Sequence, residues 1–128
     1  MPRSILVFCG LSGALAVILG ALGAHALESK LTAESLQGFK TGVSYQFYHT
    51  LALLLFAVIR EKIHKKTLKY AMYFVIAGII CFSGSIYLLA TNSLTGFADF
   101  RFLGPVTPVG GVCFIAGWIL FAVSFIKS

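Results

Sequence analysis

Charged residues are scarce in this sequence, where they make up 11% of 128 residues against roughly 25% in an average soluble domain. Hydrophobic residues make up 59%, and the mean hydropathy is +0.94. In water, a chain this short would leave much of that apolar surface exposed, because small domains have a high ratio of surface to volume. The scarcity of charge therefore excludes an ordinary soluble domain and favours a protein embedded in a lipid bilayer.

Cysteines and acids are also few, which narrows the chemistry open to the chain. Cys9, Cys81 and Cys113 lie far apart in apolar runs, which argues against a disulfide framework or a zinc site. The sequence has no nucleophile elbow, phosphate-binding loop or H-E-x-x-H motif. We therefore expect no metal and no cofactor, and nothing indicates an enzyme. The four acids, which lie outside the apolar runs, are Glu28, Glu34, Glu61 and Asp99.

Four long apolar runs predict an all-α membrane protein: a single domain, residues 1–128, forming a four-transmembrane-helix bundle with short loops. The runs cover residues 5–27, 43–59, 70–90 and 107–126, and a helix needs about 20 residues to cross a bilayer. Thr32 is a candidate N-cap for a short amphipathic helical segment that leads into the second span. Thr107 followed by Pro108 predicts the start of the fourth span, with Thr107 as its N-cap.

The Lys and Arg residues are distributed unevenly, and this predicts the orientation of the chain. Seven of them lie near the two termini and in the run Arg60–Lys69, which four spans would bring to one side. Only Lys30, Lys40 and Arg101 lie on the other side. By the positive-inside rule, both termini are cytoplasmic. The net charge of +6 suits anionic lipid head groups, and without a basic stripe on a soluble face we expect no nucleic-acid partner.

The first apolar run has a second interpretation. Arg3 ahead of an apolar run, with Ala24-His25-Ala26 at its end, also fits a cleavable signal peptide. The run is long for such a segment and three further apolar runs follow it. We therefore favour a retained first span.

Polar residues inside the predicted spans gather beneath the outer face of the membrane. Such residues mark candidate sites, although the plainer interpretation is that they hydrogen-bond across helices and hold the bundle together. Two histidines are too few for a closed zinc site. His25 and His49 also differ in depth by about 6 Å, which disfavours a haem between them. The candidate intramembrane polar site comprises His49, His25, Tyr45, Gln46, Ser83, Ser85 and Tyr87.

Small residues recur at helical spacing and predict close helix packing. Ala16, Gly20 and Ala24 form such a stripe in the first span, and stripes of this kind let helix backbones approach each other in lipid. The same stripes could instead face a second copy of the chain. Trp118 would lie near the middle of the bilayer, where its indole N–H needs an acceptor. The predicted packing residues are Gly20, Gly23, Gly84, Gly110, Gly111, Gly117 and Trp118.

Four ordered motifs carry a resemblance to a known family. They are GALGAHAL (20–27), YQFYHTLALLL (45–55), GSIYLLA (84–90) and TPVGGVCFIAGW (107–118). Together they resemble the YgdD/YwdK-like small inner-membrane proteins, which are catalogued as a domain of unknown function. The resemblance covers nearly the whole chain. It implies a four-helix protein of the bacterial cytoplasmic membrane and implies no particular activity.

These observations favour a structural, accessory or assembly subunit over a catalyst. The alternative is a small transporter or channel component that uses the polar layer in the outer half of the bundle. The partners we expect are membrane lipids and either a second copy of the chain or another membrane protein.

Overall fold

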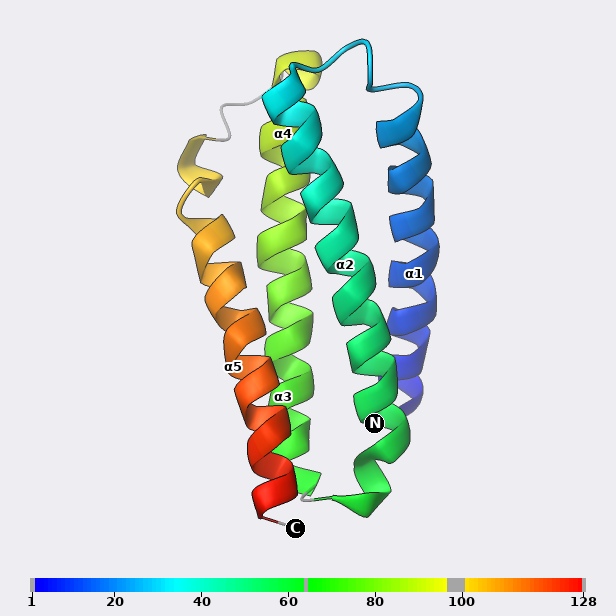
Figure 1. Ribbon diagram of the computed structural model, residues 1–128, viewed down its shortest axis with the longest axis vertical. Helices are drawn as coiled ribbons and strands as arrows, with labels where there is room; N and C mark the ends of the chain where they lie inside the picture. Colours follow the sequence, from blue (N-terminus) through cyan, green and yellow to red (C-terminus); the bar gives the residue numbers. More distant parts are fainter. Residues whose placement is uncertain (1, 64, 97–100, 128) are drawn as a thin grey trace.

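The computed structural model describes residues 2–63, 65–96 and 101–127, and these residues form helices and turns without any strand. Four helical rods run alternately up and down in one bundle, and both termini lie at the same end (Figure 1). This confirms the predicted all-α four-helix architecture. Asp99, one of the four acids noted above, lies outside the described residues.

The first two rods are α1 (Pro2–Ala24) and α2 (Ala33–Ile59), and a short 3-10 turn, η1 (Arg60–Lys62), follows α2. The third rod is a continuous helical path made of α3 (Lys65–Gly78), a π-helical segment η2 (Ile79–Gly84) and α4 (Ser85–Thr95). A second 3-10 turn, η3 (Arg101–Leu103), precedes the last rod, α5 (Val106–Ile126).

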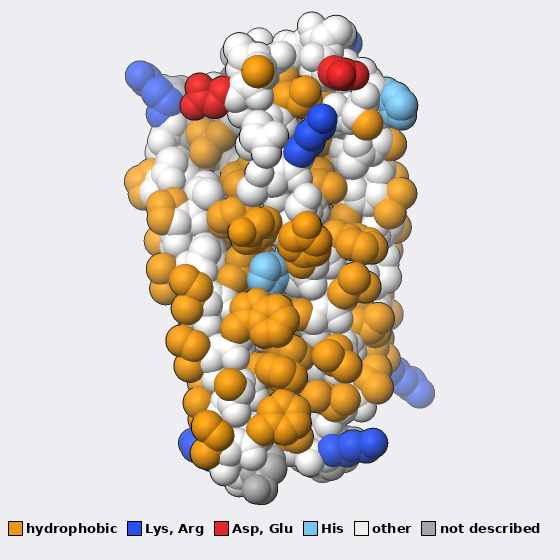
Figure 2. Space-filling view, in the orientation of Figure 1, with side chains coloured by type: hydrophobic (Ala, Val, Ile, Leu, Met, Phe, Trp, Pro, Cys, Tyr) orange, Lys and Arg blue, Asp and Glu red, His pale blue; other side chains and the backbone are white. Residues whose placement is uncertain are grey.

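All four rods are long and apolar enough to cross a membrane, over the stretches Arg3–Ala24, Ala33–Ile59, Lys66–Thr95 and Arg101–Ile126. Figure 2 shows charged side chains towards the two ends of the bundle and hydrophobic side chains across its middle. A surface banded in this way suits a bilayer, because lipid covers the apolar belt and water or head groups meet the charges.

Several helix ends differ from the sequence prediction. The prediction of Thr32 as N-cap is confirmed, because its hydroxyl accepts a 3.1 Å hydrogen bond from the Ser35 amide. The amphipathic segment is continuous with α2. The prediction of Thr107 as N-cap of the last span is wrong, because Pro105 holds that position and Thr107 lies inside the helix. Pro108 is tolerated there, since amides in the first turn of a helix lack intrahelical partners anyway.

The apolar core fills the half of the bundle nearest the termini. Phe56, Leu53, Leu68, Met72 and Val75 are each at most 1% exposed. They come from the end of α2 and the start of α3, and the start of α1 and the middle of α5 also pack against this cluster. Polar side chains become frequent in the opposite half, where the helices carry the candidate site.

Candidate functional site

Gln46 is the centre of one buried hydrogen-bond network. Its amide Nε2 donates to the Ser12 carbonyl at 2.9 Å and to the Ser12 hydroxyl at 3.2 Å, while its Oε1 accepts from the Tyr87 hydroxyl at 2.6 Å. The Ser12 hydroxyl also lies 2.8 Å from the hydroxyl of Thr50. Only 3% of Gln46 is exposed. The network therefore joins α1, α2 and α4 and gives both ends of the amide a hydrogen-bond partner.

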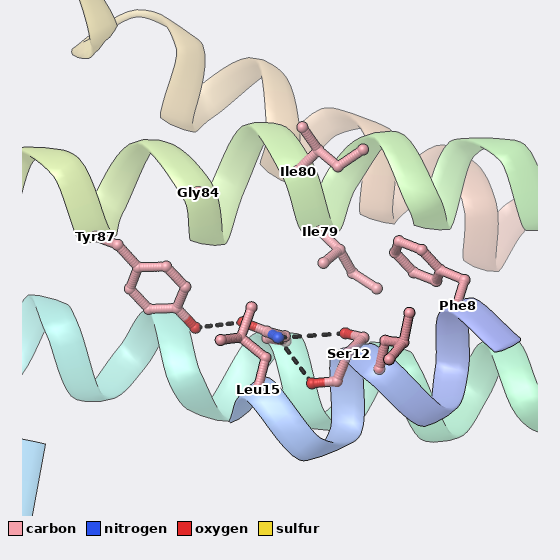
Figure 3. A pocket seen from close by; sticks show the side chains of 9 residues that line it. Phe8, Ser12, Leu15, Ile79, Ile80, Gly84 and Tyr87 are labelled. Carbon is pink, nitrogen blue, oxygen red and sulfur yellow. Dashed lines mark hydrogen bonds between the residues drawn. The ribbon is translucent and has the colours of Figure 1, made fainter. Parts of the chain in front are cut away.

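A groove of about 370 Å³ opens beside this network, between α1 and the third rod. Figure 3 shows Tyr87 and Ser12 turned towards each other across its base, with apolar side chains forming the walls. The walls include Phe8, Leu11, Leu15, Ile79 and Ile80. The groove exists because α1 packs mainly against α2, so its other side faces lipid rather than another helix.

His49 belongs to a second network on another side of α2. Its Nδ1 lies 2.8 Å from the Tyr45 carbonyl, and its Nε2 accepts a 3.1 Å hydrogen bond from the indole Nε1 of Trp118. Both contacts are satisfied by the neutral ring with its proton on Nδ1. The imidazole also stacks on Phe114, with ring centroids 3.6 Å apart and planes 15° from parallel. His49 therefore links α2 to α5, and its two ring nitrogens are already engaged.

Ser83 and Ser85 form two further links. The Ser83 hydroxyl donates to the Gly42 carbonyl at 2.7 Å, which ties the π-helical segment to α2. The Ser85 hydroxyl lies 2.5 Å from the Thr107 hydroxyl, which ties α4 to α5. Thr107 is occupied by this contact inside the bundle, which explains why it does not cap α5. Neither serine pairs with His49, although both lie in the polar half of the bundle.

The structure thus separates the seven predicted site residues. Gln46 and Tyr87 contact each other, and Tyr45 and His49 stack at 5.8 Å between ring centroids, but the two pairs serve different networks. His25 lies in the exposed turn after α1 ends at Ala24, so it joins neither network.

Sequence reasoning missed Ser12 and Thr50, both buried partners of Gln46. One signal could have pointed to them. Thr50 follows Gln46 by one helical turn, and Ser12 is a polar residue in the middle of an apolar span.

The chemistry available to these residues is hydrogen bonding between neutral groups. Among the residues that the structure describes, no three His, Cys, Asp or Glu side chains are placed to hold a metal ion. Cys9, Cys81 and Cys113 are all free thiols. The arrangement fixes helices against one another and shapes the grooves between them.

The predicted packing glycines differ in how closely a neighbour approaches. A methyl group on Gly110 would collide with the backbone of Phe82, and one on Gly117 would lie 2.8 Å from Val75 Cγ2. A methyl group on Gly20 would meet Val43 at an ordinary 3.5 Å, and one on Gly84 would meet nothing within 4 Å. Gly78, which sequence reasoning did not select, faces the Phe114 ring closely.

Comparison with known proteins places the chain in a family. Residues 19–111 match the family model described as "Protein of unknown function (DUF423)". The chain is 38% identical over 126 residues to the UPF0382 membrane protein YwdK of Bacillus subtilis (strain 168), which covers 98% of both chains. It is 40% identical over 125 residues to the UPF0382 inner membrane protein YgdD of Escherichia coli (strain K12), covering 98% of this chain and 91% of the relative. No solved structure matches it. The chain therefore belongs to the DUF423 family of small membrane proteins, as its four motifs indicated.

Proposed function

We propose that the protein is an accessory or assembly subunit of the cytoplasmic membrane that binds a transmembrane helix of a partner protein. The groove beside α1 carries this proposal. The polar side chains at the base of this groove, Ser12, Gln46 and Tyr87, bond to one another, so the surface left for binding there is apolar. An apolar groove in a bilayer accepts a helix through van der Waals packing, which drives helix association in lipid.

The arrangement of α1 supports this choice. Leu11 is 68% exposed and Leu15 is 47% exposed on the helix that packs mainly against α2. Both side chains line the groove, and Ile80 on the opposite wall is 60% exposed. A partner helix lying there would bury all three. A transporter that used this groove would instead need polar groups there that are free to bind its substrate, and the amide of Gln46 at its base is bonded at both its nitrogen and its oxygen.

A photo-crosslinking experiment tests the proposal. A photoreactive amino acid at Leu11 should yield one discrete cross-linked membrane protein, because Leu11 lines the groove. The matched control is Leu6, which is 40% exposed on the opposite side of the same helix and does not line the groove, and which should yield no such product. An excess of the same protein without the photoreactive amino acid should occupy the partner and reduce the yield of this product.

Two outcomes would count against the proposal. Equal cross-linking from Leu11 and Leu6 would mean that the groove does not bind a partner helix selectively. Solute movement or loss of membrane potential in liposomes that contain the purified chain alone would favour a transporter. A cross-linked product of twice the chain's mass would identify the partner helix as one from a second copy.

The orientation in the membrane is part of the same proposal. Both termini and the connection between α2 and α3 lie at one end of the bundle (Figure 1), and this end carries the larger share of Lys and Arg. The relative YgdD is named an inner membrane protein. We therefore place this end in the cytoplasm. Reporter fusions at the C-terminus should report a cytoplasmic location and fusions within residues 29–38 an external one, and the reverse result would contradict this orientation.

A further inference from the structure

A second groove, separate from the one beside α1, lies between α2 and α5. Its volume is about 620 Å³. Here α5 packs closely against α3 and η2, but it reaches α2 through large aromatic side chains, among them Phe114 and Trp118. Aromatic contacts of this kind hold the two helices apart and leave a slot between them. The residues that line the slot are Tyr45, Tyr48, His49, Pro108, Gly111, Val112, Phe114, Ile115 and Trp118.

The groove follows one side of α5 from its first turn to the middle of the bundle. Pro108 and Trp118 mark its two ends on this helix. They are ten positions apart, which corresponds to about 15 Å along the helix. Since both helices are membrane spans, a molecule would enter this groove from the lipid. Its ligand must therefore be soluble in the bilayer.

The walls of the groove are faces and edges of aromatic rings. Tyr45, Tyr48 and Trp118 are 41%, 59% and 44% exposed. The indole of Trp118 is fixed by its hydrogen bond to His49, which in turn stacks on Phe114. Pre-positioned rings of this kind prefer a flat, ring-shaped ligand, because ring faces and edges attract one another at specific geometries.

The hydroxyls of two residues that line the groove, Tyr45 and Tyr48, bear on the choice of ligand. In the part of the chain that the structure describes, no hydrogen bond reaches the hydroxyl of Tyr45 or of Tyr48. Tyr48 follows Lys40, the last charged residue on this side of α2, by eight positions, which is about 12 Å of helix. A polar group left unsatisfied in hydrocarbon is costly. A ligand that carries acceptor oxygens at the edge of its ring would satisfy these donors.

Gly111 keeps the groove open for a reason other than helix packing. A methyl group on Gly111 would meet only Phe82 Cδ2, at an ordinary 3.9 Å, whereas one on Gly110 would collide with the Phe82 backbone. Close packing therefore requires a glycine at 110 but not at 111. The missing side chain at 111 leaves space in the groove itself.

From these observations, we propose that the groove between α2 and α5 binds a lipid-soluble quinone. The flat ring lies against Trp118, the carbonyl oxygens accept hydrogen bonds from the hydroxyls of Tyr45 and Tyr48, and the apolar tail extends into the lipid. The proposal concerns binding alone and includes no electron transfer. It is independent of a partner helix at the groove beside α1.

Trp118 provides the test, because it is the only tryptophan in the chain. The purified protein in lipid nanodiscs is titrated with a short-chain ubiquinone analogue, and Trp118 fluorescence is recorded. Quinones quench indole fluorescence at contact, so binding should give quenching that saturates. A parallel titration uses a lipid with brominated acyl chains, which reports an ordinary lipid tail in the groove.

Two matched glycine variants decide the outcome. Gly111→Leu fills the groove and should weaken the quinone affinity about tenfold or more, while its fluorescence without quinone stays near that of the parent. Gly10→Leu is the control, since a side chain there meets nothing within 4 Å, and it should bind like the parent. Tyr48→Phe should weaken binding about threefold to tenfold through the lost hydrogen bond.

Three results would overturn the proposal. The first is quenching that rises linearly without saturation in the parent. The second is quenching that saturates equally in the parent and in Gly111→Leu. The third is strong quenching by brominated lipid that the quinone cannot displace, which would make a lipid tail the occupant.

Discussion

The first and last helices of the bundle are both rich in glycine, yet glycine serves them differently. In α5, Gly110 and Gly117 meet neighbouring helices so closely that a methyl group would clash. In α1, a methyl group on Gly10 would meet nothing within 4 Å, and one on Gly20 would make an ordinary contact. Only Gly23 in α1 has a close neighbour, 3.1 Å from an added methyl group, and that neighbour is the ring of Phe39 rather than a backbone. The glycines of α5 therefore mark a close approach to a neighbouring backbone, and those of α1 do not.

The neighbours of the two helices explain this difference. The last helix lies against the backbone of the third rod, where Phe82 belongs to the π-helical segment and the Ala71 carbonyl faces Gly117. The first helix packs mainly against α2 and is linked to the rest of the bundle through the hydrogen bonds of Gln46. Backbone contact thus secures α5, and a polar network secures α1.

The largest effect should come from Gly110→Ala. Its methyl group would collide with the amide nitrogen of Phe82 and lie 2.7 Å from its Cα, and a backbone cannot move aside as a side chain can. We expect a loss of about 3 kcal/mol or more, the upper end of typical overpacking costs. Thermal unfolding in detergent measures it, with Gly10→Ala as the control. Equal stability of the two variants would show that α5 is not seated on the π-helical segment.

A smaller effect should come from Gln46→Leu, which removes the link that holds α1. The Tyr87 hydroxyl then loses its acceptor, and an unsatisfied buried donor costs about 1–3 kcal/mol. Adding Tyr87→Phe should recover part of the loss, because the unpaired hydroxyl is removed as well. If the double variant is as unstable as the sum of the two single variants, the hydrogen bond between them is not the cause.

The fold was more predictable than the site, and particular residues show why. Hydropathy alone predicted four spans, and Thr32 was recognisable as a cap because its pattern is local. The rotation of each helix depends on its neighbours, so the sequence grouped Ser83 and Ser85 with His49 in one candidate site, whereas in the structure His49 bonds to Trp118. Residues 79–84 carry no signal for a π-helix, since the residue types of the sequence IICFSG also occur in ordinary α-helical membrane spans.

The polar layer also shows that the sequence does not predict how each helix is rotated in the bundle. Gln46 and His49 are three positions apart on α2, and both belong to the one candidate site predicted from the sequence. Because α1 lies on one side of this helix and α5 reaches it from another, a rotation of about 60° between the two side chains is enough to divide them. One cluster in the sequence therefore became two networks in the bundle.

Variants of His49 test the hydrogen bond that links α2 to Trp118 of α5. His49→Leu removes the acceptor of the Trp118 indole, so we expect a loss of about 1 kcal/mol and a shift in the emission maximum of Trp118. His49→Gln should retain most of the stability, because an amide oxygen can still accept this bond. Emission spectra and unfolding curves of the two variants provide the measurement. A parent-like spectrum for His49→Leu would mean that the indole finds another partner.

The smallest effect should come from Gly20→Ala, at the position where a stripe of small residues in the first span predicted tight packing. The new methyl group would lie 3.5 Å from Val43 Cγ1, which is ordinary van der Waals contact with a side chain. Alanine also favours the helix by about 1 kcal/mol relative to glycine. We therefore expect a stability within about 0.5 kcal/mol of the parent, or slightly above it, when unfolding is followed in detergent.

Leu51→Ala is a suitable companion, because Leu51 is 51% exposed on the lipid-facing surface and its truncation should change the stability as little. A loss at Gly20 comparable to that at Gly110 would mean that α1 and α2 approach each other as closely as α5 and the third rod, and the contrast between the two glycine-rich helices would disappear.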